Sequence, residues 1–312
     1  MPSSLVCGAV VLAGAGIAAQ TAGVDPEQLL STRLAFTAAE VGQVRQGQPV
    51  VRVKLDADEL SAVGAIRLPG RKERLADWVK NIDHFRRSAE IGMAQPIPTP
   101  PSAASLAGVT LDAADRQALQ ACTAEKCAMR VSADLLARIQ HEPSRADEVF
   151  RGMLLAELTG YIAHGNAAAV APLVQKATTL TALSPELARF LERYPSATLP
   201  SADQMFYWGW TPAGSVAILT LHHLILYKPR PGEIWIADKN LYASRYFDTG
   251  VLVIGLYDAA DGNGFYAVAG SRATSGYLSG TAASLLRRRI QRSASDTVKV
   301  YLEWLRDSLS AG

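Results

Sequence analysis

Two adjacent histidines are the residues of this 312-residue sequence whose chemistry most directly suggests a reaction or a bound ligand. His222 and His223 fall within Val216–Tyr227, a run of β-branched and apolar residues that predicts a strand. Because successive side chains of a strand point to opposite faces, the two imidazoles cannot bind one metal ion together without a bulge. One is expected to face a core or cavity, either as a base or ligand or as a hydrogen-bonded structural residue.

Hydroxyl and indole side chains add to this set. Tyr242, Ser244 and Tyr246 share one face of a predicted strand, where they could orient the polar end of a ligand or serve as ordinary strand residues. Trp208 and Trp210 share one face of an earlier strand and are expected to lie in the core or to contact a ligand. The sequence contains no nucleophile motif, phosphate loop or dinucleotide fingerprint, so it identifies no reaction.

A long amphipathic helix is predicted over Thr281–Leu309. Its apolar positions recur at steps of three, four and seven and draw one stripe that a sheet or another helix must cover: Leu285, Leu286, Ile290, Val298, Tyr301, Leu302, Leu305 and Leu309. Ser293 and Thr297 place small polar groups within this stripe, near Tyr301 at helical spacing. The sheet is therefore expected to stand away from the helix there, which would make the helix one wall of a ligand cavity.

The beginning of the sequence differs from everything after it. From Leu5 to Ala19 the chain is apolar or small, and it carries no charge before Asp25. A stretch of this length fits the core of a signal peptide better than a membrane span. Residues 1–22 are therefore predicted to be a cleaved export signal, and the mature protein is expected to be periplasmic or secreted.

Charge and cysteine content narrow the classes of protein. The net charge of +2, from 31 Lys and Arg against 29 Asp and Glu, gives no reason to expect nucleic acid as a partner. One basic cluster in the final helix is either its solvated face or a contact with anionic lipid: Arg287, Arg288, Arg289 and Arg292. Cys122 and Cys127 are predicted to form a disulfide, because the alternative, a zinc site, lacks further ligands. No cofactor or metal is expected.

Strands and helices mix in the first part of the chain. Helices are predicted over Asp25–Val44 and Lys72–Phe85, and strands over Val50–Leu55 and Ala62–Leu68. A short strand is also predicted over Ala128–Val131. Ala- and Leu-rich helical spacing follows and predicts a helical insertion at about 133–200.

Strand-like runs then follow in close succession: Gln204–Trp210, Val216–Tyr227, Glu233–Asp238, Leu241–Phe247, Val251–Tyr257 and Phe265–Arg272. Asp261-Gly262-Asn263-Gly264 is a strong hairpin signal. Short turns between consecutive strands predict an antiparallel meander, so the fold class is α+β.

This layout resembles the START-like, or helix-grip, superfamily, which includes polyketide-cyclase-like proteins. The resemblance covers Val50–Phe85 and Gln204–Leu309, where Tyr266-Ala-Val-Ala-Gly-Ser-Arg-Ala-Thr-Ser leads into the final helix. The segments Leu241-Tyr-Ala-Ser-Arg-Tyr-Phe-Asp and Gly270-Ser-Arg-Ala also look like those of an uncharacterised group of exported bacterial proteins. The resemblance implies a single domain over 23–312, with a curved antiparallel sheet gripping the C-terminal helix around an apolar cavity.

The expected function is binding or transport of an apolar small molecule or lipid in that cavity, in the bacterial cell envelope. One alternative is a cyclase- or hydrolase-type enzyme that uses the same cavity, with His222 or His223 and a tyrosine as acid–base groups. The other is a non-catalytic envelope protein whose ligand is another protein. The residues expected to line the cavity are Trp208, Trp210, His222, His223, Tyr242, Ser244, Tyr246, Tyr266, Ser293, Thr297 and Tyr301.

Overall fold

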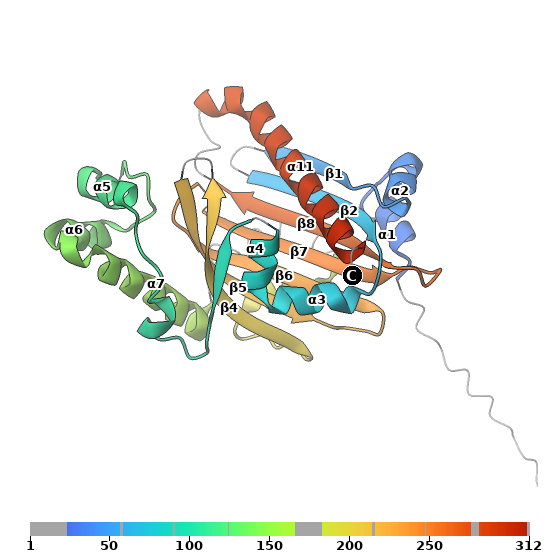
Figure 1. Ribbon diagram of the computed structural model, residues 1–312, viewed down its shortest axis with the longest axis horizontal. Helices are drawn as coiled ribbons and strands as arrows, with labels where there is room; N and C mark the ends of the chain where they lie inside the picture. The colour runs from blue at the N-terminus through green and yellow to red at the C-terminus, as the bar shows by residue number, and fades with distance from the viewer. Residues whose placement is uncertain are drawn as a thin grey trace, which may run out of the picture.

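The computed structural model is an α+β fold built on one eight-stranded antiparallel sheet (Figure 1). It describes residues 24–310, apart from 57–58, 90, 124, 166–182, 214–215, 247 and 276–280. The strand order is β1-β2-β8-β7-β6-β5-β4-β3. The predicted signal peptide, residues 1–22, lies outside the described residues.

The strands from β4 onward form the predicted meander. The strands are β1 (Val50–Asp56), β2 (Glu59–Leu68), β3 (Met93–Ile97), β4 (Ala202–Ala213), β5 (Val216–Tyr227), β6 (Glu233–Ala243), β7 (Thr249–Asp258) and β8 (Phe265–Thr274). The hairpin signal lies between β7 and β8, where Gly262 and Gly264 have φ of 71° and 89°. A side chain at Gly264 would collide with the carbonyl of Leu68, so both backbone conformation and space require glycine there.

One prediction about the strands was wrong in detail and another was wrong outright. The strand expected over Glu233–Asp238 and the start of the one expected over Leu241–Phe247 form the single strand β6, which ends at Ala243 and is irregular where it pairs with β5. Ala128–Val131 forms no strand. Instead, the backbone amide of Arg130 donates to the carbonyl of Ser244 at 2.8 Å, which ties this loop to the end of β6.

The described helices are α1 (Pro26–Thr32), α2 (Ala38–Arg45), α3 (Lys72–Lys80), α4 (Ile82–Ser88), α5 (Ala113–Ala121), α6 (Ala133–His141), α7 (Ala146–His164), α10 (Pro185–Arg193) and α11 (Thr281–Ser310), with short 3₁₀ helices η1 (Ala103–Leu106) and η2 (Pro143–Arg145). The first predicted helix is broken because Ala35 has φ of 53° and Thr37 then starts α2 through a capping box with Glu40. The second is broken at Asn81, whose ψ of 66° is not helical.

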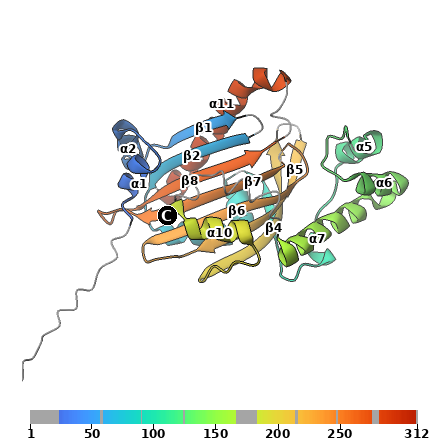
Figure 2. The same cartoon turned by 180° about the vertical axis from the view of Figure 1, so that it is seen from behind.

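Helices cover both faces of the sheet. α11 crosses one face over β1 and β2, and α3 and α4 lie on the same face (Figure 1). Leu302, Leu305 and Leu309 of α11 are buried there, and each contributes roughly 1.5–3 kcal/mol by leaving water. α1, α2 and α10 cover the other face (Figure 2).

A helical block of α5, α6 and α7 packs beside β3, β4 and β5 around its own apolar core. Cys122 and Cys127, just after α5, have their sulfur atoms at bonding distance and their Cα atoms 4.9 Å apart. Asp115 of α5 forms an ion pair with Arg245, which follows β6, and their side chains are only 3% and 9% exposed. This buried pair connects the helical block to the sheet.

Removing one partner of this pair should destabilise the protein strongly. Asp115→Ala leaves the Arg245 charge buried without compensation, and we expect a loss of about 3–5 kcal/mol in the free energy of unfolding measured by urea denaturation. Glu142→Ala removes a partner of Arg145 from an exposed pair and should cost less than about 1 kcal/mol. Equal losses in the two variants would show that Asp115 does not act as an anchor.

Candidate functional site

His222 and His223 point to opposite faces of the sheet. β5 places Leu224 and Leu226 in the core beneath α11, and it places Ile225 and Tyr227 in the core on the opposite face. His222 therefore lies on the face that carries α11, and His223 lies on the other. Each histidine joins a different set of polar side chains.

On the α11 face, His222 is held by a carboxylate. Its Nδ1 lies 2.8 Å from Oδ1 of Asp238, and the hydroxyl of Tyr207 donates to Oδ2 of the same carboxylate at 2.6 Å. The rings of Tyr207 and His222 stack with centroids 4.5 Å apart and planes 2° apart. Burial alone would raise the pKa of Asp238, but the attraction and hydrogen bond of His222, together with the bond from Tyr207, lower it. The carboxylate is therefore ionised and orients the imidazole.

Arg86 of α4 completes this group from above the sheet. Its Nη2 donates to Oγ1 of Thr211 at 2.6 Å and to the carbonyl of Ile91 at 3.1 Å, and its guanidinium carbon lies 6.0 Å from the Tyr207 ring centre. Asn240 lies directly opposite His222 on β6. We call Arg86, Tyr207, His222, Asp238 and Asn240 the sheet-face polar cluster.

An aromatic cavity opens between α3, α4 and the C-terminal part of α11. It has a volume of about 230 Å³ and is lined by Trp78, His84, Phe85, Ser88, Trp304 and Ser308. Two of its walls contact Tyr301, whose ring centre lies 6.1 Å from that of Phe85 and 5.9 Å from that of Trp304. Burial raises the pKa of Tyr301, on which the charges of Arg86 and Asp238 also act. Tyr301 thus packs against the aromatic walls of the cavity, on the sheet face that also carries the polar cluster.

The sheet beneath α11 is less covered than its opposite face. Along β7, Val251 and Val253 on the opposite face are only 3% and 2% exposed. Leu252 and Ile254, which alternate with them and face α11, remain half-buried. This face therefore keeps apolar surface that its own helices do not cover.

Most of the other residues predicted to line a cavity lie elsewhere. Trp208, Trp210 and Tyr242 belong to the apolar core of the helical block, and Tyr266 belongs to the core covered by α1, α2 and α10. None of these four lies beneath α11. Three of them have polar atoms with structural partners: Trp208 Nε1 donates to the Ser105 carbonyl at 3.1 Å, the Tyr242 hydroxyl to the Arg130 carbonyl at 2.7 Å, and the Tyr266 hydroxyl to Glu27 at 2.6 Å.

The other residues predicted to line the cavity are also spread over different parts of the structure. Ser244 is buried, and its hydroxyl accepts from the Leu219 amide at 3.0 Å. Tyr246 lies beyond the end of β6, has φ of 65° and is 40% exposed, so it shares no strand face with Tyr242. The side chains of Ser293 and Thr297 lie outside the described residues. Of the predicted set, His222 lies on the sheet face that carries α11, and Tyr301 lies on α11 itself against Phe85 and Trp304.

His223 belongs to a second polar network beneath α7 and α10. Its Nδ1 lies 2.9 Å from the Tyr161 hydroxyl and its Nε2 lies 3.0 Å from Oε1 of Gln204. Nζ of Lys239, directly opposite His223 on β6, donates to the same Tyr161 hydroxyl at 3.1 Å. Burial lowers the pKa of Lys239 to about 7, and burial together with the Lys239 charge lowers the pKa of His223 to about 3. His223 is therefore a neutral structural histidine.

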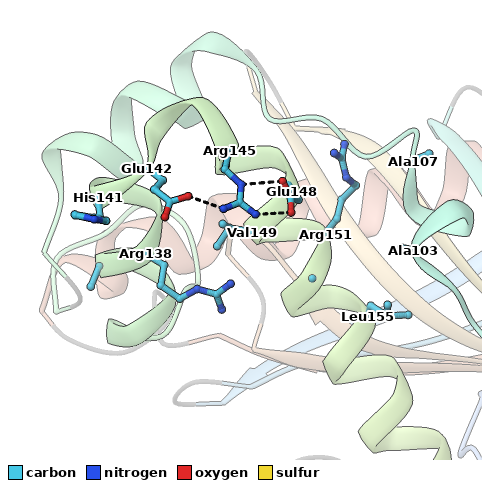
Figure 3. Close-up of a pocket in the computed structure, with 12 residues that line it drawn as sticks. Ala103, Ala107, Arg138, His141, Glu142, Arg145, Glu148, Val149, Arg151 and Leu155 are labelled. Atoms are coloured by element: carbon cyan, nitrogen blue, oxygen red, sulfur yellow. Dashed lines mark hydrogen bonds and ion pairs between the residues drawn. The ribbon is translucent and has the colours of Figure 1, made fainter.

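A larger groove lies on the helical block, between η1, α6 and α7 (Figure 3). Its volume is about 760 Å³, and its wall combines alanine and glycine with basic and acidic side chains of α6, η2 and α7. At its centre, Arg145 is held at 2.7 Å by both Glu142 and Glu148 (Figure 3). These exposed charges satisfy one another, so the groove is a weaker candidate than the site beside α11.

Several residues of the site beside α11 were not predicted from the sequence. Asp238 is the last residue of a predicted strand. Only the register between β5 and β6 shows that its side chain meets His222. Trp78 and Phe85 were assigned to one predicted helix that ended before Arg86, and the break at Asn81 was not foreseen. A signal did exist, because three consecutive polar residues, Asp238-Lys239-Asn240, interrupt an otherwise apolar strand.

Lys239 should make stability depend on pH. Between its folded-state pKa of about 7 and its ordinary value of 10.5, the unfolded chain binds more protons, so the free energy of unfolding should rise with pH. The full effect is at most about 5 kcal/mol, and it is lost as the pH falls toward 7. We expect Lys239→Met to flatten this rise in urea denaturation from pH 7 to 10, whereas Lys54→Met, at an exposed position, should leave it unchanged. An unchanged slope in Lys239→Met would contradict the assignment.

No group of three or more His, Cys, Asp or Glu residues that could hold a metal ion occurs in the part of the chain that the structure describes. Within those residues, no helix is both long and apolar enough to cross a membrane. No family model matches the chain, and no curated protein matches it either. Function is therefore inferred from the site itself.

Proposed function

We propose that this is a helix-grip protein that binds or carries a small, mainly apolar molecule between α11, α4 and the sheet. The observation that carries this proposal is the aromatic cavity of about 230 Å³ beside α11, lined by Trp78, Phe85 and Trp304. Concave sites walled by aromatic side chains with a few polar groups are the usual form of small-molecule sites. The half-buried Leu252 and Ile254 supply further apolar surface on the sheet below.

The sheet-face polar cluster offers groups that could recognise a polar end of such a ligand. Tyr301 packs against Phe85 and Trp304 of the cavity wall, and it belongs to the same apolar core as Tyr207 of the polar cluster. An elongated molecule with its apolar part among the aromatic rings would therefore direct its polar part toward His222. A site of this form favours lipids and hydrophobic metabolites over sugars or nucleotides.

We also propose that the protein is exported to the cell envelope and loses residues 1–22. The bonded pair Cys122 and Cys127 supports this, because disulfides persist in oxidising compartments. Contact between the basic side of α11 and anionic lipid stays part of the proposal. Arg292 is exposed, whereas the side chains of Arg287, Arg288 and Arg289 lie outside the described residues.

Blocking the cavity should abolish ligand binding without unfolding the protein. Ser88→Trp places an indole at the exposed rim of the cavity, and we expect the affinity for the neutral fluorescent probe N-phenyl-1-naphthylamine to fall by about tenfold or more. Stability should change by less than about 0.5 kcal/mol, because the position is on the surface. Native mass spectrometry of protein purified from its host should detect a bound apolar molecule in the unaltered chain and not in Ser88→Trp.

Ser144→Trp is the matched control, because Ser144 is exposed in η2 on the helical block. It should bind the probe as the unaltered chain does. Equal probe affinity in all three proteins would place the apolar ligand elsewhere.

A second candidate is a cyclase- or hydrolase-type enzyme that uses the same site. The observation that favours it is the 2.8 Å contact between Nδ1 of His222 and Asp238, which leaves Nε2 of the imidazole without a partner. A histidine oriented in this way by a carboxylate can act as a general base toward water or an acidic C–H group.

The enzyme reading predicts hydrolysis of short p-nitrophenyl esters that His222→Gln reduces by about 100-fold, the usual contribution of a general base. His141→Gln changes an exposed histidine of the helical block and should have no effect. Residual rates that do not differ between the two variants would leave binding as the function.

A further inference from the structure

The groove on the helical block is lined by small side chains that leave it open (Figure 3). Its volume of about 760 Å³ lies in the range that is usual for small-molecule sites. A Cβ atom at Gly152 of α7 would meet no other atom within 4 Å, and Leu155, one turn further along, is half-buried. The other small residues of the wall are Ala103, Ala107 and Ala137. The groove thus combines open space with apolar surface along α7.

Two hydrogen bonds attach the η1 side of the groove to α7. Nη1 of Arg151 donates to the carbonyl of Val109 at 3.1 Å, and the amide of Leu111 donates to Oδ1 of Asp147 at 3.0 Å. Val109 and Leu111 are both buried in the core of the helical block. The two walls are therefore held in place by the fold, and the groove is formed before any ligand arrives.

The positive charges of the groove are not all compensated. Glu142 and Glu148 both bind Arg145, so these carboxylates are already occupied. Arg138 of α6 forms no hydrogen bond or ion pair with any residue that the structure describes. Arg151 is hydrogen-bonded to a neutral carbonyl, and its charge contributes after that of Arg145 to lowering the pKa of Glu148.

The balance of charge indicates the kind of ligand. With His141 counted as neutral, the lining has three arginines against two glutamates, which leaves one excess positive charge. A single carboxylate would neutralise it, whereas the double charge of a phosphate monoester would exceed it. The forked N–H groups of a guanidinium also match the two oxygens of a carboxylate. A cationic ligand would find both glutamates occupied by Arg145.

We propose that this groove is a second binding site, for a molecule with one carboxylate and an apolar body, such as an aryl- or alkyl-carboxylic acid. The carboxylate pairs with Arg138, and the charge of Arg151 acts on it from α7. The apolar body lies along α7 over Gly152 and Leu155. The site is separate from the aromatic cavity beside α11 and does not depend on the function proposed for that cavity.

Two probes of equal size test the charge requirement in ligand-observed NMR titrations at pH 8. 4-Phenylbutyrate carries the carboxylate, and 4-phenylbutanamide replaces it with a neutral amide. We expect the acid to bind about threefold to fivefold more tightly than the amide, as solvent-exposed ion pairs allow. This preference should shrink when NaCl is raised from about 20 mM to about 500 mM, because salt screens exposed charges. Equal binding of the two probes, or binding of neither, would overturn the proposal.

Two glycine variants of the same helix locate the probe. Gly152→Trp fills the groove from a position with open space around it, and binding of 4-phenylbutyrate should fall by about tenfold or more without a lower midpoint of thermal unfolding. Gly160→Trp is the matched control, because a Cβ atom there also meets nothing within 4 Å but lies outside the groove. It should bind as the unaltered chain does. Equal binding in both variants would overturn the proposal.

Arginine variants test the partner of the carboxylate without filling the groove. Arg138→Gln should reduce the preference for the acid over the amide to less than about twofold. Arg189→Gln changes an exposed arginine of α10 and should retain the preference in full. Ser88→Trp, which blocks the aromatic cavity, should also retain it. An undiminished preference in Arg138→Gln, or its loss in Ser88→Trp, would place the carboxylate elsewhere and overturn the assignment.

Discussion

The pairing of β5 with β6 is the constraint on which both polar networks depend. It sets His222 opposite Asn240 and His223 opposite Lys239, so neighbouring residues of each strand send their side chains to opposite faces. The face that carries α11 thereby receives the carboxylate-held imidazole, and the other receives the lysine–tyrosine–histidine network. A slip of one residue in β5 would place His223 beneath α11 and His222 against Tyr161, and both networks would lose their partners.

A β-bulge between β5 and β6 determines which side chains of β6 can join the polar cluster. Leu221 pairs with Tyr242 and His222 pairs with Asn240, so Leu241 is an extra residue on β6. Such a bulge reverses the alternation beyond it. Without it Tyr242 would share a face with Asn240, whereas in the structure its ring packs 6.2 Å from Phe150 in the helical block. The bulge thus separates His222 from Tyr242 and Ser244, which the sequence pattern assigned to the same ligand cavity.

Local periodicity allowed much of the architecture to be predicted. The meander and the final helix follow from alternation and from a helical stripe, and neither requires knowledge of distant partners. The site could not be predicted in the same way because its members come from separate elements, with Arg86 in α4, Tyr207 in β4 and Asp238 in β6. Lys239 shows the limit most clearly, since a lysine in a strand is expected to face solvent, yet it is 1% exposed.

The two histidines differ in how completely their ring nitrogens are satisfied. In the network beneath α7, both ring nitrogens of His223 have partners, and the amine of Lys239 donates to Tyr161. A satisfied buried network stabilises one arrangement of the chain and needs no ligand to explain it. Beneath α11, the His222–Asp238 pair is equally well oriented, but polar atoms beside it lack partners and apolar sheet residues lie half-exposed. Because stability alone would favour pairing the free ring nitrogen, His222 is the histidine whose surroundings folding explains less completely.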